Sequence, residues 1–195
     1  MRTFRPSLRR ASSLIATCVA CAVFAVAGRA SAEKLSATGA AVLLKILSYD
    51  QELASRADST VVIGVAVPAG AGGDSASLQS VSQLKSVKVL GRAIRAVPVQ
   101  LRSSGELRKA LIAESVDALI VPDGLSATQL TAVIDACRNT KIPSMGLSRA
   151  AAEGGIAVGV EIRDQVTIYV NAAEAFAQGA RFRSELLRLA IRVDR

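Results

Sequence analysis

The 195-residue sequence contains no histidine and no tryptophan, and only 3% of its residues are aromatic. Without histidine the chain cannot build a Ser-His-Asp or Cys-His nucleophile system, and it lacks the commonest protein ligand of transition metals. The few aromatic side chains leave little surface on which bases or sugar rings could stack. These absences disfavour triad hydrolases, histidine-ligated metal sites and nucleic-acid binding.

Cysteine is also scarce. Two of the three cysteines, Cys18 and Cys21, lie near the N-terminus, which leaves Cys137 alone in the rest of the chain. Cys137 falls within a helical pattern and is expected to be a small buried hydrophobe. A single thiol cannot form an internal disulfide, so an intermolecular or redox role is the alternative.

Residues 1–32 have the pattern of a secretory signal peptide. The pattern consists of a basic start with Arg2, Arg5, Arg9 and Arg10, an apolar run over residues 11–27, and a small-residue exit at Ala30-Ser31-Ala32. The apolar run is shorter than the about 20 residues of a membrane-spanning helix. Alternatives are a retained anchor, a twin-arginine signal and lipidation at Cys21. We therefore expect export to the periplasm, with no stable membrane insertion after cleavage.

Most of the net charge of +8 belongs to this segment. It carries five arginines and no acidic residue, so the net charge falls to +3 once residues 1–32 are removed. The remaining basic residues are scattered, without the runs typical of a nucleic-acid surface. Residues 33–195 are long enough for one domain with its own core.

Short β-branched runs alternate with helical patterns in residues 36–147. Strands are expected over 60–67, 93–101, 117–121 and 142–147, and helices over 36–55, from Asp74 or Ser75 toward Leu90, over 104–114 and over 126–138. This alternation indicates right-handed βαβ units and a mainly parallel sheet. Pro98 suggests that the second strand lies at an edge or is kinked.

After Gly154-Gly155 the pattern changes. Apolar residues alternate with small or polar ones over 156–162 and 166–170, which predicts a β-hairpin with one buried face. A helix over 171–178, a break at Gly179 and a helix from Ser184 follow; the residues expected to face inward there are Leu186, Leu187, Ala190 and Ile191. The sequence therefore predicts a single three-layer α/β domain with a mainly parallel sheet, a C-terminal β-hairpin and closing helices.

Two segments at strand ends are candidate sites. The glycine-rich residues 68–75 join a strand to a helix, a geometry that can cradle phosphate, but they match no known phosphate-binding motif and are more simply a surface loop. Ligands of open α/β sheets bind at the carboxyl ends of the strands. The residues there that could form a rim for a ligand or a partner are Asp123, Gly124, Ser148, Arg149, Glu153 and Gly154.

Four carboxylates, Asp123, Glu153, Glu161 and Asp164, fall in expected turns or in the hairpin, where such groups are usually solvated. Their spacing fixes no pair, so a glycosidase-type arrangement is a distant alternative. No metal-ligand spacing is present. We expect no catalytic residue, no metal and no cofactor, and therefore a protein that is not an enzyme.

Several motifs of the chain occur together in one known family. They are Leu43-Leu44-Lys45-Ile46-Leu47, residues 61–65 (VVIGV), residues 118–121 (ALIV), residues 154–158 (GGIAV), residues 166–171 (VTIYVN), Ala175, Gly179-Ala180, Phe182 and residues 184–190 (SELLRLA). In these the chain resembles the YfiR family, also called HmsC-like, over essentially all of residues 33–195. The motifs are structural: Asn171 is expected to cap the next helix, and Leu186 and Leu187 to be core.

The chain departs from the family pattern in two places. Members usually have an aromatic-Pro stretch where this chain has Tyr49-Asp50-Gln51, and some carry paired cysteines, whereas Cys137 has no partner. Redox-linked control is therefore not carried over to this chain.

The resemblance implies a periplasmic regulator without catalytic activity. Such a protein binds the periplasmic portion of an inner-membrane signalling protein, often a diguanylate cyclase, and holds it inactive; release raises cyclic di-GMP and favours biofilm formation. The sequence leaves the oligomeric state, monomer or homodimer, open. The leading alternative is a periplasmic small-ligand binding module that feeds a sensor or transporter, with a polar-lined pocket around Asp123 and Arg149. An unusual hydrolase is a distant third.

Overall fold

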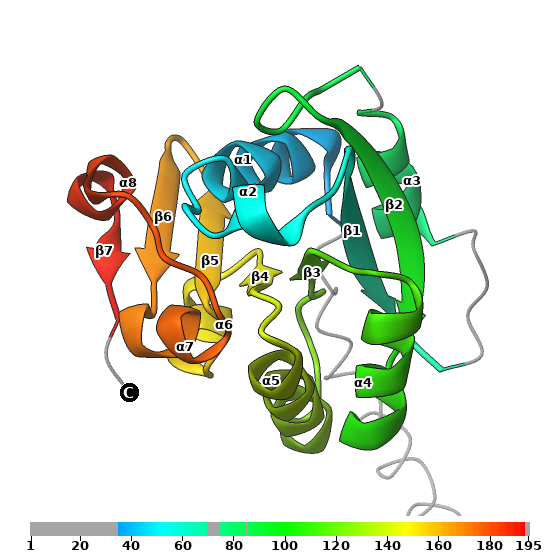
Figure 1. Cartoon of the computed structure of the whole chain (residues 1–195). Helices are drawn as coiled ribbons and strands as arrows, with labels where there is room; N and C mark the ends of the chain where they lie inside the picture. Colours follow the sequence, from blue (N-terminus) through cyan, green and yellow to red (C-terminus); the bar gives the residue numbers. More distant parts are fainter. Residues whose placement is uncertain (1–34, 70–74, 85, 194–195) are drawn as a thin grey trace, which may run out of the picture. The chain divides into compact units, whose positions relative to one another are not determined.

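The computed structural model describes residues 35–69, 75–84 and 86–193. The expected signal peptide and residues 70–74 of the glycine-rich loop lie outside this range. Within it the chain forms a seven-stranded sheet with helices on both faces (Figure 1). None of the described helices combines the length and apolar character needed to cross a membrane.

The sheet has the order β2-β1-β3-β4-β5-β6-β7. Its strands are β1 (Thr60–Val67), β2 (Ala93–Gln100), β3 (Ala118–Ile120), β4 (Ser144–Gly146), β5 (Val158–Ile162), β6 (Val166–Val170) and β7 (Ile191–Arg192). Strands β1 to β5 pair in parallel, β6 pairs antiparallel with β5, and β7 pairs in parallel with β6. The predicted βαβ units and the C-terminal hairpin are confirmed.

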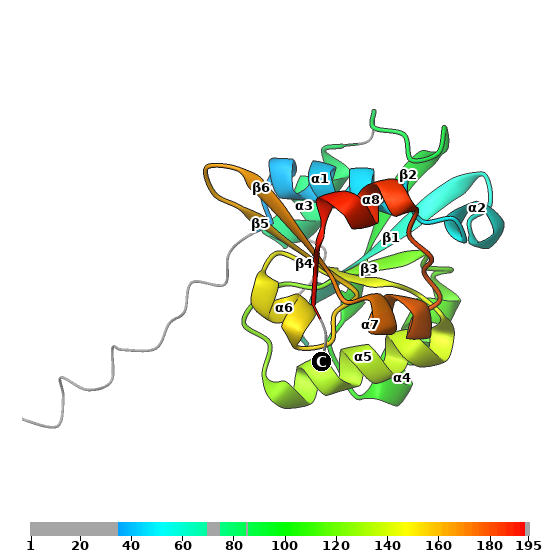
Figure 2. The same ribbon diagram turned by 90° about the vertical axis from the view of Figure 1, so that its left-hand side faces the viewer.

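Helices form a layer on each side of the sheet. They are α1 (Ala37–Leu47), α2 (Leu53–Arg56), α3 (Ala76–Ser82), α4 (Ser104–Ala113), α5 (Ala127–Thr140), α6 (Arg149–Glu153), α7 (Ala172–Ala177) and α8 (Ser184–Leu189). The views of Figure 1 and Figure 2 agree that α1, α3 and α8 lie on one face and α4 to α7 on the other. This is the predicted three-layer α/β architecture.

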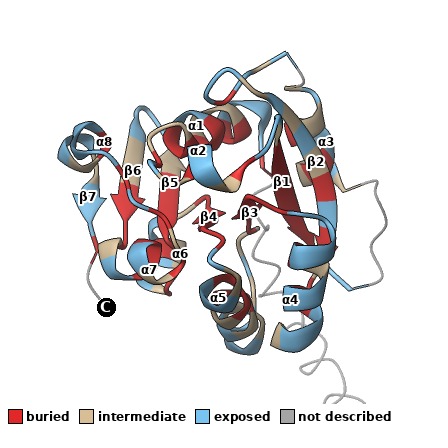
Figure 3. Ribbon diagram, viewed as in Figure 1, coloured by how far each residue is buried: buried red, intermediate tan, exposed pale blue. Residues whose placement is uncertain are grey.

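Strand β1, which lies between β2 and β3, shows why the sheet is covered on both faces. All of its residues except Thr60 are buried. Val61, Ile63 and Val65 belong to one apolar cluster, while Val62 belongs to another on the opposite face. Strand β2, by contrast, buries only Val97 and Val99 and lies at the sheet edge, as Pro98 suggests. In Figure 3 buried residues accordingly concentrate in the central strands and on the inward sides of the helices.

The predicted helix over 36–55 is wrong in its second half. Helix α1 ends at Leu47, and a turn separates it from the single turn of α2. The reason is a tertiary contact: the buried Asp50 carboxylate accepts hydrogen bonds from the backbone N–H groups of Glu52 and Arg181 and pairs with Arg56. Continuing the helix through Asp50 would remove these bonds.

Three other predictions differ from the structure. Helix α3 stops at Ser82 rather than running toward Leu90, because Val89 and Arg92 form a tight bridge in which Leu90 has a positive φ of 52°. The sequence predicts a turn at Glu153, but this residue ends helix α6. The sequence predicts Ile191 in the core, but it forms the edge strand β7 and is 51% exposed.

The helix cap and the helix break predicted for residues 171–184 are confirmed. The Asn171 side chain accepts from Glu174 N at 3.1 Å and caps α7, and Gly179 has a φ of 81° that ends this helical segment. Helix α8 begins at Ser184. Leu186 is buried and Leu187 is partly buried against the same core.

Candidate functional site

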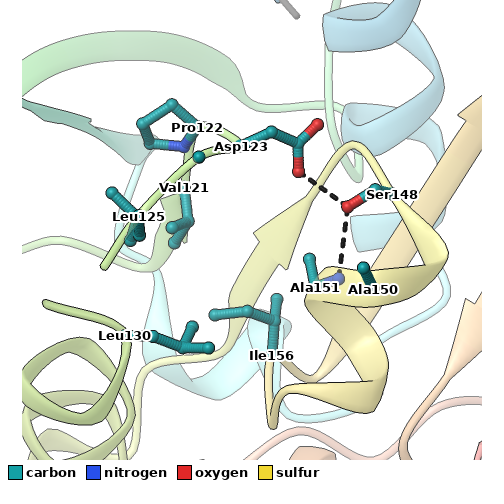
Figure 4. Close-up of a pocket in the computed structure, with 10 residues that line it drawn as sticks. Val121, Pro122, Asp123, Leu125, Leu130, Ser148, Ala150, Ala151 and Ile156 are labelled. Atoms are coloured by element: carbon teal, nitrogen blue, oxygen red, sulfur yellow. Dashed lines mark hydrogen bonds between the residues drawn. The ribbon is translucent and has the colours of Figure 1, made fainter. Parts of the chain in front are cut away.

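A cavity of about 330 Å³ opens at the carboxyl ends of β3 and β4. It lies between the loop that joins β3 to α5 and the start of α6. Its lining consists of Val121, Pro122, Asp123, Gly124, Leu125, Leu130, Ser148, Ala150, Ala151 and Ile156 (Figure 4). The strand order reverses between β1 and β3, so the loop after β3 borders the reversal point. Open α/β sheets bind ligands at such points, outside the carboxyl ends of the strands. The cavity therefore has the location and about the minimum size of a small-molecule site.

Asp123 and Ser148 form the polar side of this cavity. The Ser148 hydroxyl donates to Asp123 Oδ1 at 2.7 Å and accepts from Ala151 N at 3.2 Å (Figure 4). The second bond makes Ser148 the N-cap of α6. Both hydrogen-bonding roles of the hydroxyl are therefore structural, and they hold the Asp123 carboxylate over the start of α6.

Three glycines allow α6 to lie close to the sheet and to α5. A Cβ on Gly159 would stand 2.2 Å from the carbonyl oxygen of Ser148, and one on Gly146 would stand 2.8 Å from Ala151 Cβ. A Cβ on Gly154, which ends α6, would stand 2.8 Å from Leu130 Cδ2. The glycines therefore set the position of Ser148 and of the apolar wall of the cavity.

Arg149 and Glu153 lie on the outer side of α6. The Arg149 guanidinium donates to Glu153 Oε1 at 2.6 Å, a hydrogen bond that raises the pKa of Arg149, and it stands 5.9 Å from the centre of the Tyr169 ring. Neither residue lines the cavity. The expected polar pocket around Asp123 and Arg149 is therefore replaced by a mostly apolar one, in which Asp123 takes part and Arg149, paired with Glu153, does not.

The structure thus brings Asp123, Gly124 and Ser148 together around one cavity and leaves Arg149, Glu153 and Gly154 outside it. The apolar lining was missed by sequence reasoning. A signal was present: Val121-Pro122 and Leu125 place apolar residues in a loop directly after a strand, where polar residues are usual. Such residues either complete a core or line a site, and sequence alone does not separate the two.

Other potentially reactive groups lie elsewhere. Cys137 is fully buried, and burial raises the pKa of its thiol to about 12, which agrees with the prediction of a buried hydrophobe. In the described part of the chain, no three Cys, Asp or Glu side chains are placed to hold a metal ion. Two further depressions, one at the 161–167 hairpin and one lined by Glu52, Lys141, Phe176, Gly179 and Arg181, are open and carry mixed charges.

The family model described as YfiR/HmsC-like matches residues 36–191, which is nearly the whole described domain. The chain belongs to the YfiR/HmsC-like family. Members of this family are periplasmic regulatory proteins. The matched range includes the cavity, the hairpin and the closing helices of this YfiR/HmsC-like chain. Among curated proteins, none matches the chain.

Solved structures share the fold of this YfiR/HmsC-like chain at low sequence identity. A substrate binding protein with adhesive properties from Clostridium difficile, in its ligand-free open form, is similar with a TM-score of 0.56 and 17% identity, over 82% of this chain and 60% of that one. An ABC domain in complex with L-Trp from Streptococcus pneumonia has a TM-score of 0.53 and 15% identity, over 77% and 60%.

A conserved domain protein from Vibrio cholerae is similar to the same degree, with a TM-score of 0.52 and 16% identity, over 80% and 59%. The chain therefore spans about three-fifths of the length of each of these proteins. At these identities the likeness shows the α/β fold alone.

Proposed function

We propose that residues 1–32 export this YfiR/HmsC-like chain to the periplasm, where it binds the periplasmic part of an inner-membrane signalling protein and represses it. The partner class that we propose is a diguanylate cyclase, so release of the partner would raise cyclic di-GMP and favour biofilm formation. The observation that carries the proposal is the family match over residues 36–191. The proposed role is not enzymatic.

Repression by contact needs only a surface that binds one conformation of the partner better than the other. A ligand that distinguishes the two states by about 1–3 kcal/mol already shifts the balance by roughly 5- to 150-fold. A single rigid α/β domain suits this task, because its two helix layers pack on one continuous sheet and hold its surface in place.

The proposal is tested by deleting the gene in cells that contain, or lack, the partner cyclase. We expect cyclic di-GMP to rise on deletion only when the cyclase is present. Expression of the full chain should restore the low level, whereas a chain without residues 1–32 should not, because it stays in the cytoplasm. Unchanged cyclic di-GMP in both backgrounds would contradict the proposal.

A second function, binding of a small ligand in the periplasm and its presentation to a sensor or transporter, is favoured by the cavity at the carboxyl ends of β3 and β4. The shared fold with substrate binding proteins agrees with it but shows the fold alone. This function is separable from repression, because a ligand can occupy the cavity whether or not a partner is bound. It predicts that a suitable small molecule raises the melting temperature of the purified protein.

A further inference from the structure

The cavity at the ends of β3 and β4 contains a single ionisable side chain. Of its ten lining residues, only Asp123 carries a charge; the others are apolar, apart from Gly124 and Ser148. Figure 4 shows the Asp123 carboxylate on the same side as Ser148, with Leu130, Ile156 and Ala151 below it. The cavity thus combines an apolar interior with one negative charge at its edge.

Nothing in the described residues neutralises that charge. Asp123 Oδ1 accepts from the Ser148 hydroxyl, which is neutral, and no donor from these residues reaches Oδ2. Every ion pair within the described range involves other carboxylates. Arg149, the nearest arginine in sequence, is held by Glu153. A cation at Oδ2 would therefore supply a charged partner that the described residues do not provide.

We propose that this cavity binds a small monocation with an apolar body, such as a primary amine on a branched aliphatic chain. Its ammonium group would contact Asp123, and its hydrocarbon body would lie against Leu125, Leu130 and Ile156. This inference rests on the second function above, ligand binding in the cavity, and names the class of ligand. It does not depend on the proposed repression of a partner.

Charge and shape both favour this class over its relatives. A carboxylate ligand of the same skeleton would place a second negative charge beside Asp123, where like charges repel. A neutral alcohol would fill the apolar part but would leave the Asp123 charge without a partner. A charged hydrogen bond is roughly twice as strong as a neutral one, so the amine should bind most tightly.

The test compares three probes with one carbon skeleton: 3-methylbutylamine, 3-methylbutanol and 3-methylbutanoate. Each is titrated into the ¹⁵N-labelled purified protein, and amide signals are followed by NMR. We expect the amine to shift the signals of residues 123–125 and 148–151, to bind about tenfold more tightly than the alcohol, and to displace the alcohol when both are present at equal concentration. The carboxylate at the same concentration should not displace the amine.

Two variants and two matched controls locate the site. Asp123→Asn keeps an oxygen that can accept from Ser148, so it preserves the cap of α6 while it removes the charge. Ala150→Leu places a larger side chain at the cavity. Each should weaken amine binding by about tenfold. The controls, Asp164→Asn in the exposed hairpin turn and Ala113→Leu at the exposed end of α4, should leave it unchanged.

Each other outcome overturns the inference. Equal binding of amine and carboxylate, or amine binding that survives Asp123→Asn, would show that Asp123 does not select a cation. Amine binding lost equally in Asp164→Asn would indicate a general surface-charge effect. Tighter binding of the alcohol or the carboxylate would refute the proposal that the ligand is an amine, but it would still support ligand binding in the cavity. If none of the probes bound, the amine would be refuted, and only a screen with other ligands would then test the second function.

Discussion

The close approach of β5 to the start of α6 can be tested with one methyl group. In Gly159→Ala the new Cβ would stand 2.2 Å from the carbonyl oxygen of Ser148, 3.1 Å from its carbonyl carbon and 3.2 Å from Ala152 Cβ. The first two atoms belong to the backbone, so no side-chain rotation relieves the clash. Either β5 or the start of α6 must move.

Overpacking of this kind typically costs about 1–3 kcal/mol, and a backbone clash belongs at the upper end of that range. We expect the free energy of unfolding of Gly159→Ala to fall by about 2–3 kcal/mol. For a domain of this size, that loss corresponds to a melting temperature lower by about 4–12 °C. Where the start of α6 is the part that moves, the hydrogen bond between Ser148 and Asp123 weakens as well.

The assay is thermal and urea unfolding followed by circular dichroism. Gly105→Ala is the matched control: Gly105 lies in α4, and a Cβ there meets nothing within 4 Å. Since alanine is the better helix former, this variant should gain up to about 1 kcal/mol. A Gly159→Ala protein as stable as the wild type, or an equal loss in Gly105→Ala, would refute the packing argument.

Three further tests concern the buried residues Asp50, Asp117 and Cys137. Asp50→Ala leaves the half-buried Arg56 guanidinium without its carboxylate, so the free energy of unfolding measured in urea should fall by about 3 kcal/mol. The control Asp164→Ala, in the exposed hairpin turn, should lower it by less than about 0.5 kcal/mol. Equal losses in the two variants would contradict this prediction. Burial raises the pKa of Asp117 above its ordinary 3.8, so the folded state holds this proton more tightly than the unfolded state does. The free energy of unfolding of the wild type, relative to that of Asp117→Asn, should therefore fall as the pH rises from 3.8 to the raised pKa. A free energy of unfolding that rises over this pH range would contradict the raised pKa. Cys137, whose pKa burial raises to about 12, should react with iodoacetamide at about pH 8 only after unfolding, and mass spectrometry of the folded protein would detect any exception.

Much of the fold could be predicted because local signals and tertiary packing agree. The run from Thr60 to Val67 has the pattern of a strand buried on both faces, and it forms β1, which lies between β2 and β3. Ser126 carries a capping signal followed by a helical pattern, and α5 begins after it with a capping box. Where a segment contains its own capping residue and a regular spacing of apolar residues, the sequence alone predicts the helix or strand.

The predictions are wrong where contacts with residues far along the chain determine the local structure. Asp50 ends the first helical segment because it binds Arg181, which lies far along the chain. The two-residue strand β7 exists only because β6 offers free backbone groups, so Ile191 pairs through its backbone and leaves its side chain exposed. For α6 the signals were present, namely the Ser148 cap and the Arg149–Glu153 spacing, but five residues are too few for a periodic pattern.

The candidate site was half predictable for the same reason. The rule that ligands bind at the carboxyl ends of parallel strands placed Asp123, Gly124 and Ser148 on one edge, and the structure puts these three around one cavity. The ion pair that removes Arg149 from it, and the contribution of Leu130 and Ile156 to its wall, depend on how α5 and α6 pack.

The central claim, repression of an inner-membrane protein by contact in the periplasm, is tested most directly by crosslinking in intact cells. The tagged full chain is expressed and crosslinked, and the captured proteins are identified by mass spectrometry, with the chain lacking residues 1–32 as control. We expect one inner-membrane protein with a periplasmic domain and a cytoplasmic signalling domain, captured only by the exported chain. Capture of nothing specific, together with a small molecule that co-purifies with the protein, would contradict the claim and favour the ligand-binding function.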